Sequence, residues 1–308
     1  MLLSIVFLLI GFILLVKGAD YFVSGSSSVA RRLRIPPVVI GLTIVAMGTS
    51  LPEASVSITA AFAGSNEIAL SNVIGSNTFN TLVVLGASAF IRPFPIDRDI
   101  LRRDQPVNTA VTVLLLALVL DGMLGRIDGL ILLACMIVYL FVVVRAALQE
   151  RDNMVDDRAP QPLPLSVFLI ILGIAAIVFG GDLVVDAACN IARVVGLSET
   201  VIGLTIVAIG TSLPELVTSV VAARKGESEL ALGNVVGSNL FNILFILGSS
   251  SALSPIGVLT ENIIDLGILL AVTLALLVIC RVLPRLGKKL GASGILLYVG
   301  YTVYLLMR

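Results

Sequence analysis

Apolar residues occur in long runs along this chain, separated by short polar or charged breaks. A run of about 20 apolar residues crosses the hydrocarbon core of a bilayer as a helix. The runs predict ten membrane-spanning helices, at residues 2–30, 36–64, 67–91, 105–120, 127–147, 164–192, 199–223, 228–254, 262–280 and 290–307. Several runs are longer than a bilayer requires, which predicts tilted or broken helices.

Two other interpretations of the apolar runs are not favoured. A transmembrane β-barrel alternates apolar and polar residues in segments of about ten, and these runs do not alternate. A cleaved signal peptide carries basic residues ahead of its apolar core, and none precedes Leu2. We therefore expect an all-α, polytopic membrane protein whose first helix is structural.

Composition narrows the function classes. The chain is 58% hydrophobic and 13% charged, whereas soluble domains are about 45–50% apolar and 25% charged. Twenty basic residues balance twenty acidic ones, so no positive excess favours nucleic acid. The absence of His removes Ser-His-Asp triads and His-ligated metals. We expect no enzymatic activity, no cofactor and no obligate protein partner, and membrane lipid and inorganic cations as the partners.

The distribution of Lys and Arg orients the predicted helices. Sixteen of the twenty follow the first, third, fifth, seventh and ninth predicted helices. Because basic loops stay on the cytoplasmic side of a membrane, these loops are expected to face the cytoplasm. We therefore predict a multi-pass protein of the cell membrane with both termini outside the cell.

Two sequence motifs occur twice in the chain. Residues 40–53 (IGLTIVAMGTSLPE) and 202–215 (IGLTIVAIGTSLPE) are identical at 13 of 14 positions, and residues 70–86 and 232–248 agree at 11 of 17. Both pairs lie 162 residues apart. The offset predicts two five-helix repeats, at residues 1–148 and 164–308, joined by a short cytoplasmic linker at 149–163. Because five is odd, the second repeat is inverted, which is the architecture of secondary transporters.

Each repeat places one carboxylate deep in a predicted helix. Glu53 and Glu215 stand at equivalent positions near the bilayer centre, with no Lys or Arg at that depth. An intramembrane carboxylate costs at least about 2.5 kcal/mol and indicates function. Pro52 and Pro214 remove a helical hydrogen bond beside each glutamate, which predicts breaks in helices 2 and 7 at the midplane. Protonated, hydrogen-bonded glutamates are the structural alternative to a bound cation.

Hydroxyl and amide side chains surround these glutamates in the sequence pattern. Four further asparagines are expected to serve packing or hydrogen bonding and not to bind a cation: Asn72, Asn234, Asn77 and Asn239. Carboxylate, amide and hydroxyl oxygens favour Na⁺, Ca²⁺, Mg²⁺ or Mn²⁺, and a flexible cage suits Ca²⁺ and Na⁺ better than Mg²⁺. A site that holds either one divalent ion or several monovalent ions would exchange them. The predicted ligands are Glu53, Thr49, Ser50, Ser76 and Asn80 in one repeat, and Glu215, Thr211, Ser212, Ser238 and Asn242 in the other.

The paired G-T-S-L-P-E and G-N-V-x-G-S-N-x-F-N type motifs resemble those of the calcium/cation antiporter superfamily, specifically the sodium/calcium exchangers. The resemblance covers the whole chain. It implies sodium/calcium exchange by alternating access, with the same side chains as ligands and with backbone carbonyl ligands near Ala46 and Ala208. It also implies that the helices at 2–30 and 164–192 slide across the other eight.

Two features depart from some members of this family. Relatives associated with potassium co-transport carry Asp where this chain has Asn242, so we expect no potassium requirement. The linker at 149–163 is too short for the calcium-sensing domains of animal exchangers, and we expect its acidic residues to be solvated. Asp20 and Asp182 occupy equivalent positions, where we expect helix-end hydrogen bonding or gating.

Rival functions remain open at this point. A proton/calcium exchanger, or a proton exchanger of another divalent cation, would use Glu53 and Glu215 as proton carriers. A passive cation channel would use similar oxygens without a counter-ion. An intramembrane hydrolase is disfavoured because Ser50 and Ser212 have neither a G-x-S-x-G motif nor a histidine. If more than two Na⁺ exchange for one Ca²⁺, transport moves net charge and responds to voltage.

Overall fold

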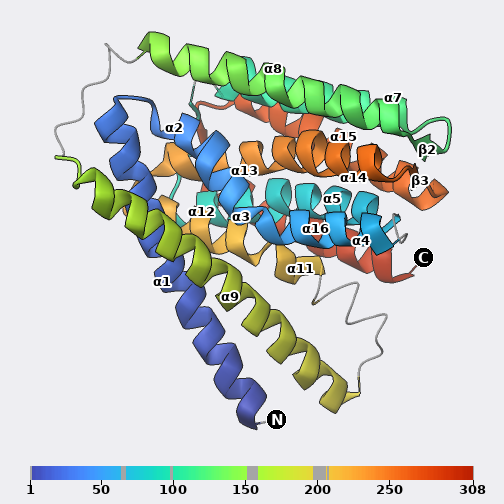
Figure 1. The fold of residues 1–308 in the computed structure, drawn as a ribbon, viewed down its shortest axis with the longest axis horizontal. Helices are drawn as coiled ribbons and strands as arrows, with labels where there is room; N and C mark the ends of the chain where they lie inside the picture. Colours follow the sequence, from blue (N-terminus) through green and yellow to red (C-terminus); the bar gives the residue numbers. More distant parts are fainter. Residues whose placement is uncertain are drawn as a thin grey trace.

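A computed structural model describes residues 2–63, 67–97, 100–150, 159–196, 206 and 208–307, which are almost entirely helical (Figure 1). Helices lie within all ten predicted segments. Their α-helical parts are α1 (Leu2–Leu33), α2 (Pro37–Ile40), α3 (Ala46–Thr49), α4 (Leu51–Ala63), α5 (Glu67–Phe79), α6 (Leu85–Ile91), α7 (Gln105–Leu118), α8 (Arg126–Glu150), α9 (Leu163–Val195), α11 (Ala208–Thr211), α12 (Leu213–Lys225), α13 (Ser228–Phe241), α14 (Gly248–Leu253), α15 (Thr260–Val282) and α16 (Lys288–Met307).

Wider π-helical turns interrupt several of these helices. They are η1 (Gly41–Val45), η2 (Asn80–Val84), η3 (Ile100–Asp104) and η6 (Asn242–Leu247). η2 joins α5 to α6, and η6 joins α13 to α14, so each predicted helix at 67–91 and 228–254 is one continuous rod with a π-helical middle. Such turns are frequent at functional sites.

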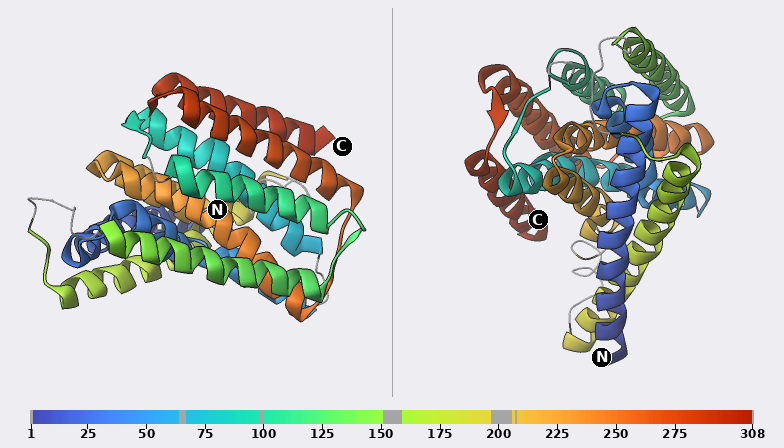
Figure 2. Two further views of the ribbon diagram at one scale, coloured as in Figure 1. Left: turned by 90° about the horizontal axis from the view of Figure 1, so that it is seen from above. Right: turned by 90° about the vertical axis from the view of Figure 1, so that its left-hand side faces the viewer.

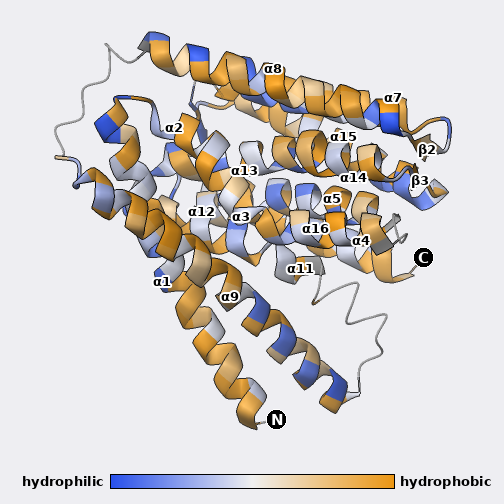
Figure 3. Cartoon of the chain, viewed as in Figure 1, coloured by the Kyte–Doolittle hydropathy of each residue, from blue (hydrophilic) through white to orange (hydrophobic). Residues whose placement is uncertain are grey.

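Seven of the described helices are long and apolar enough to cross a membrane, or eight if the bent pair at 37–62 counts as one span. Hydrophobic residues predominate along α8, the N-terminal half of α1 and the first half of α9 (Figure 3). The chain is therefore a polytopic membrane protein. Part of the predicted helix at 199–223 lies outside the described residues, and α7 has only 14 residues.

The two rods that carry the repeated asparagine motifs form the centre of the bundle (Figures 1 and 2). We compare the most apolar 18-residue stretch of each long span. In this stretch 94% of the residues are buried for the span at 228–253 and 72% for the span at 68–91, against 11–33% for the other five. The central rods are also among the less apolar spans. Polar side chains are therefore kept away from the lipid, as hydrocarbon requires.

α1 and α9 form an antiparallel pair that extends beyond the rest of the bundle (Figures 1 and 2). Their backbones meet at glycines. A Cβ atom at Gly173 would lie 2.7 Å from the backbone nitrogen of Phe22 and 2.8 Å from the carbonyl oxygen of Gly18. Gly11 and Gly180 make an equivalent contact further along the pair. Only glycine permits this approach, so the glycines determine how closely the two long helices pack.

Both TSLPE motifs interrupt a helix at the serine. Ser50 separates α3 from α4 with φ −84° and ψ 13°, and Ser212 separates α11 from α12 with φ −93° and ψ 6°. Pro52 and Pro214 then occupy the first turn of the following helix, where a missing amide hydrogen costs nothing. The first break bends the chain by 50°. The breaks lie where proline and its neighbours predict them.

Two short antiparallel ladders connect loops of the two repeats. β1 (Phe94–Pro95) pairs with β4 (Arg285–Leu286), and β2 (Met123–Leu124) pairs with β3 (Ile256–Gly257). The pattern of apolar runs predicts no strands. Shifting each strand by 162 residues converts one ladder, register included, into the other. The two repeats are therefore interchangeable in their pairing as well as in their motifs.

We predict that Gly173→Ala weakens the α1–α9 pair, because its methyl group would meet the α1 backbone. A clash of this kind costs about 1–3 kcal/mol, and the midpoint of thermal unfolding in detergent should fall by several degrees. Gly300→Ala in α16 is the matched control, since no atom lies within 4 Å of a Cβ there. An equal fall in both variants would show that the close contact at Gly173 is not limiting.

Candidate cation-binding site

The two repeated glutamates meet in the middle of the bundle, and each is held by the serine of the opposite repeat. The hydroxyl of Ser50 donates to Oε1 of Glu215 at 2.7 Å, and the hydroxyl of Ser212 donates to Oε1 of Glu53 at 3.0 Å. All four residues have no exposed surface. Each carboxylate therefore receives a hydrogen bond from the other repeat, which places the two helix breaks close together.

The second oxygen of each carboxylate has no partner. Oε2 of Glu53 and Oε2 of Glu215 are buried without a hydrogen bond, and the two carboxylates are close enough to repel each other. Among the described residues, no Lys or Arg pairs with either one. Asp104, equally buried, differs because the Arg103 guanidinium binds both of its oxygens at 2.8 and 3.0 Å.

Further unpartnered oxygens come from the central rods. The hydroxyl of Ser76 lies beside Glu53 and that of Ser238 beside Glu215, and neither completes a hydrogen bond. Oδ1 of Asn80 and Oδ1 of Asn242 are also buried without a partner. Burying a polar atom without a partner costs roughly 1–3 kcal/mol. So many in one place fit a site whose oxygens bind a ligand.

The π-helical turns begin at these two asparagines. η2 starts at Asn80 and contacts α12, the helix of Glu215, while η6 starts at Asn242 and contacts α4, the helix of Glu53. Each asparagine therefore stands in an element that packs against the glutamate helix of the other repeat.

The remaining predicted ligands lie at the ends of the broken helices. The hydroxyl of Thr49 is 3.1 Å from Oδ1 of Asn234 and 3.3 Å from the carbonyl oxygen of Ala46. That carbonyl also accepts from the amide of Ser50 at 3.0 Å, whereas the one hydrogen of the Thr49 hydroxyl goes either to this carbonyl or to Asn234. Thr211 is half-buried at the end of α11, which Ala208 begins. The side chain of Ala208 is outside the description.

Two serines that the sequence analysis did not select support the site. Nδ2 of Asn72 donates to Oγ of Ser57 at 3.0 Å, and Nδ2 of Asn234 donates to Oγ of Ser219 at 2.9 Å. Asn72 and Asn234 thus hydrogen-bond between neighbouring helices, as their expected packing role implies. The signal for Ser57 and Ser219 was available, because each lies four residues after its glutamate and they share the offset of 162.

The acidic residues outside the centre are arranged differently. Asp20 forms an ion pair of 2.7 Å with Lys225, the last residue of α12, and the Lys225 ammonium also donates to the hydroxyl of Ser24 at 2.6 Å. This ion pair joins the middle of α1 to the C-terminal end of α12. Asp182 is exposed on α9. Most of the linker, including its three aspartates, lies outside the described residues.

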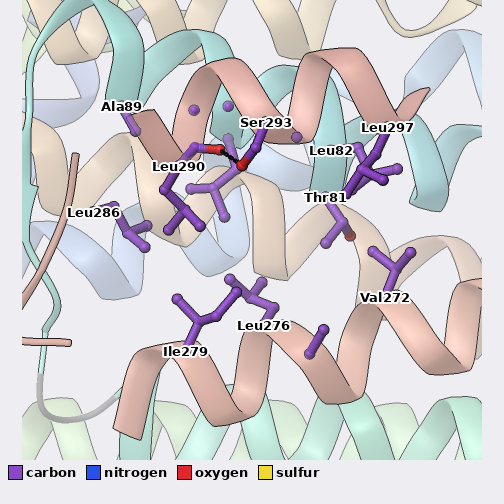
Figure 4. Close-up of a pocket in the computed structure, with 15 residues that line it drawn as sticks. Thr81, Leu82, Ala89, Val272, Leu276, Ile279, Leu286, Leu290, Ser293 and Leu297 are labelled. Atoms are coloured by element: carbon purple, nitrogen blue, oxygen red, sulfur yellow. Dashed lines mark hydrogen bonds between the residues drawn. The ribbon is translucent and has the colours of Figure 1, made fainter. Parts of the chain in front are cut away.

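A separate cavity of about 140 Å³ lies between α15, α16 and the η2–α6 segment (Figure 4). Its walls are apolar apart from Thr81 and Ser293, and Ser293 donates to the carbonyl oxygen of Leu290 at 2.8 Å. None of the predicted ligands lines it. The polar centre and this cavity are therefore distinct features.

Comparison with known proteins places these features in a family context. The profile described as "Sodium/calcium exchanger protein" matches residues 3–145 and again 165–307, at the same offset of 162. The chain is 40% identical to a putative antiporter, CaxA, of Alkalimonas amylolytica. The aligned region covers 99% of this chain and 98% of that protein. It is 32% identical to the sodium/calcium exchanger MaX1 of Methanosarcina acetivorans, with 97% of both chains covered.

A solved structure is also similar over nearly its full length. The sodium-calcium exchanger NCX_Mj, soaked with 2.5 mM Na⁺ and 0.1 mM Ca²⁺, superposes with a TM-score of 0.86 at 34% sequence identity. The match covers 96% of both chains. The likeness therefore includes the central rods, the broken helices and the α1–α9 pair together.

We predict that Glu53→Gln raises the thermal unfolding midpoint in chelator and without sodium. Gln keeps an acceptor for Ser212, removes the repulsion from Glu215, and supplies a donor to the neighbouring oxygens. A gain of about 1 kcal/mol would raise the midpoint by roughly 2–4 °C in a chain of a few hundred residues.

Asp104→Asn is the matched control for this prediction. Asp104 is equally buried but paired with Arg103, so its loss should lower the midpoint. A fall in Glu53→Gln as large as that in Asp104→Asn would contradict unrelieved repulsion at the centre. An unchanged midpoint would instead favour a proton shared between the two glutamates.

Proposed function

The chain belongs to the sodium/calcium exchanger family, and from this premise we propose that it exchanges Na⁺ for Ca²⁺ across the cell membrane by alternating access. The observation that carries the proposal is the centre itself, where two neighbouring carboxylates are buried and no cationic side chain of the described residues pairs with them. Two carboxylates neutralise one Ca²⁺, and the surrounding neutral oxygens suit a hard cation of flexible coordination. The transported ions are the only ligands in this proposal, which includes no cofactor.

The proposed ligands are the oxygens already described. Four of them, Oε2 of each glutamate and the hydroxyls of Ser76 and Ser238, have no other partner. Ser50 and Ser212 donate to the glutamates and would turn their lone pairs to an ion. The complete proposed set is Glu53, Glu215, Thr49, Ser50, Ser76, Asn80, Thr211, Ser212, Ser238 and Asn242, with the carbonyl oxygens of Ala46 and Ala208.

Sodium is proposed as the counter-ion because the same oxygens would bind several monovalent ions in place of one divalent ion. Ca²⁺ and Na⁺ then cannot occupy the site at the same time, so the binding of one ion displaces the other and the two are exchanged. We propose that more than two Na⁺ leave for each Ca²⁺, so that transport is electrogenic. Asn242 is neutral, and the exchange is proposed to be independent of potassium. The site is fully buried, which argues against a passive channel.

A proton/calcium exchanger is the second candidate, and the same observation favours it. Burial and a neighbouring like charge both favour the protonated form of a carboxyl group, so such a pair of carboxylates is also suited to binding protons. Such an exchanger would use Glu53 and Glu215 as the proton carriers. Proton coupling is distinguished from sodium coupling only by which gradient drives calcium.

The proposed architecture is two inverted repeats of five spans, at residues 1–148 and 164–308, with the linker at 149–163 in the cytoplasm. Two observations support this architecture. A shift of 162 residues maps each strand ladder onto the other, and the serine of each repeat bonds to the glutamate of the other repeat. The broken helices would then meet at the midplane, and the α1–α9 pair would slide across the remaining helices. Both termini would face outward.

We predict that proteoliposomes loaded with Na⁺ take up labelled Ca²⁺ when diluted into sodium-free, potassium-free buffer. Glu53→Gln and Glu215→Gln should each reduce uptake at least about 100-fold, equivalent to about 2.8 kcal/mol, because one carboxylate cannot neutralise Ca²⁺. Asp121→Asn, an exposed carboxylate in a loop, is the control that should retain uptake.

The outcomes of this experiment separate the rival functions. Uptake driven by a pH step and indifferent to sodium would replace the proposal with the proton exchanger. Calcium movement without any counter-gradient would favour a channel. An inside-positive potential should accelerate uptake if more than two Na⁺ leave per Ca²⁺, and voltage-independent exchange would refute electrogenicity.

We predict the orientation of the chain from thiol labelling of intact cells, in a background without the three native cysteines. Asp121→Cys should react with a membrane-impermeant maleimide, whereas Lys289→Cys should react only after permeabilisation. Both positions are exposed, and the positive-inside rule assigns them to opposite sides. The reverse labelling pattern would place both termini in the cytoplasm.

A further inference from the structure

A chain of buried hydrogen bonds lies beside the candidate site, between the two central rods. Nδ2 of Asn242 donates to Oδ1 of Asn77 at 3.0 Å, and Nδ2 of Asn77 donates to the carbonyl oxygen of Asn239 at 3.0 Å. Nδ2 of Asn239 donates to Oγ1 of Thr81 at 2.9 Å, and that hydroxyl donates to the carbonyl oxygen of Asn77 at 2.8 Å. All four side chains are buried.

Two backbone carbonyls determine the direction of every bond in this network. A carbonyl oxygen only accepts hydrogen bonds, so the Asn77 atom that faces Asn239 must be its NH2 group. The other amide atom of Asn77 is then an oxygen, and Asn242 must donate to it. Similarly, Thr81 uses its one hydrogen on the carbonyl of Asn77, so Asn239 must donate to Thr81. The assignment of amide oxygen and nitrogen follows from the backbone.

The network leaves the oxygen of Asn242 available. With its NH2 group engaged by Asn77, Oδ1 of Asn242 is buried and has no partner. Asn242 lies one turn after Ser238, whose unpartnered hydroxyl is beside Glu215, and residues four apart share a helix face. The free oxygen therefore belongs to the same polar centre as the carboxylates.

The equivalent residues of the first repeat are not arranged in this way. Under the offset of 162, Asn80 corresponds to Asn242 and Asn239 to Asn77. Asn239 gives its NH2 group to Thr81 instead, and neither amide atom of Asn80 has a partner. The position equivalent to Thr81 is Ile243, which has no hydroxyl. Identical asparagines in the two repeats are therefore held differently, because one repeat has a threonine where the other has an isoleucine.

We propose that Asn77 is a positioning residue that presents the carbonyl oxygen of Asn242, rather than its NH2 group, to the transported cation. The inference rests on the proposed cation-exchange function. An amide turned the other way would direct its positive N–H dipoles at the ion, so fixing the amide in advance spares the ion that reorientation. Asn80, without such a partner, turns its oxygen to the ion only when the ion binds.

Equilibrium binding of labelled Ca²⁺ to the purified protein tests this role. Asn77→Ala should raise the half-saturating calcium concentration by about 10–100-fold, the usual effect of removing a residue that orients a metal ligand. In sodium-driven exchange the same variant should raise the apparent KM for calcium more than it lowers the maximal rate. If Asn77→Ala is not monodisperse, Asn77→Ser, which is too short to bridge Asn242 and Asn239, takes its place.

The matched control is Asn239→Ala, which removes the equivalent side chain of the other repeat but keeps the carbonyl that holds Asn77. It should change calcium affinity by less than about threefold. A second control repeats Asn77→Ala in an Asn242→Asp background. A carboxylate presents oxygen in either orientation and needs no positioning, so the cost of Asn77→Ala should fall below about threefold there.

The possible results distinguish a positioning role of Asn77 from a general packing role. Equal losses in Asn77→Ala and Asn239→Ala, or an undiminished loss in the Asn242→Asp background, would show a general packing role and overturn the proposal. Wild-type affinity in Asn77→Ala would also overturn it. If the wild-type protein itself neither binds nor transports calcium, the proposed function fails instead, and the two failures are thereby distinguished.

Discussion

A carboxylate in the interior of a membrane protein needs hydrogen-bond donors, a counter-charge or a proton, because hydrocarbon supplies none of them. This chain buries two such groups at one place, and the rest of the structure is arranged around them. One oxygen of Glu53 and one of Glu215 receive a serine hydroxyl. The other oxygen of each carboxylate is buried without a hydrogen-bond partner. No basic side chain among the described residues relieves the charge, although the chain pairs Asp104 with Arg103 elsewhere.

The position of the helix breaks follows from the same constraint. A continuous helix would satisfy its own backbone and keep Ser50 and Ser212 in regular turns. Proline two residues after each serine allows the helix to restart there, and the serine becomes the junction between two helices. The serine of one repeat is then adjacent to the glutamate of the other. Neither carboxylate is satisfied within its own repeat, so the centre forms only when both repeats are packed together.

Symmetry in this protein is strong in the backbone and weaker in the side chains. The two ladders and the two asparagine–serine bonds interchange under one offset. The ion pair of Asp20 with Lys225 does not, because the residue equivalent to Lys225 is an alanine. The amide network differs as well, through Thr81 and Ile243. Pseudo-symmetric halves with unequal side-chain contacts would place the two states of an alternating cycle at different free energies.

The sequence by itself determined the helical membrane class, the repeat, the helix breaks and the two glutamates. These depend on local properties: the length of an apolar run, the missing amide of proline, and the cost of a charge in lipid. Only the tertiary structure decided which oxygens are already used. The pairing of Ser50 with Glu215, the pairing of Ser212 with Glu53, and the bond between Asn242 and Asn77 all join residues from different repeats. A motif repeated in sequence predicts equal roles for Asn80 and Asn242. In the structure Asn77 holds the amide of Asn242, whereas Asn239 bonds to Thr81 and leaves the amide of Asn80 without a partner. Hydrogen bonds between distant segments have no local signature, because their donors and acceptors are chosen by the approach of whole helices.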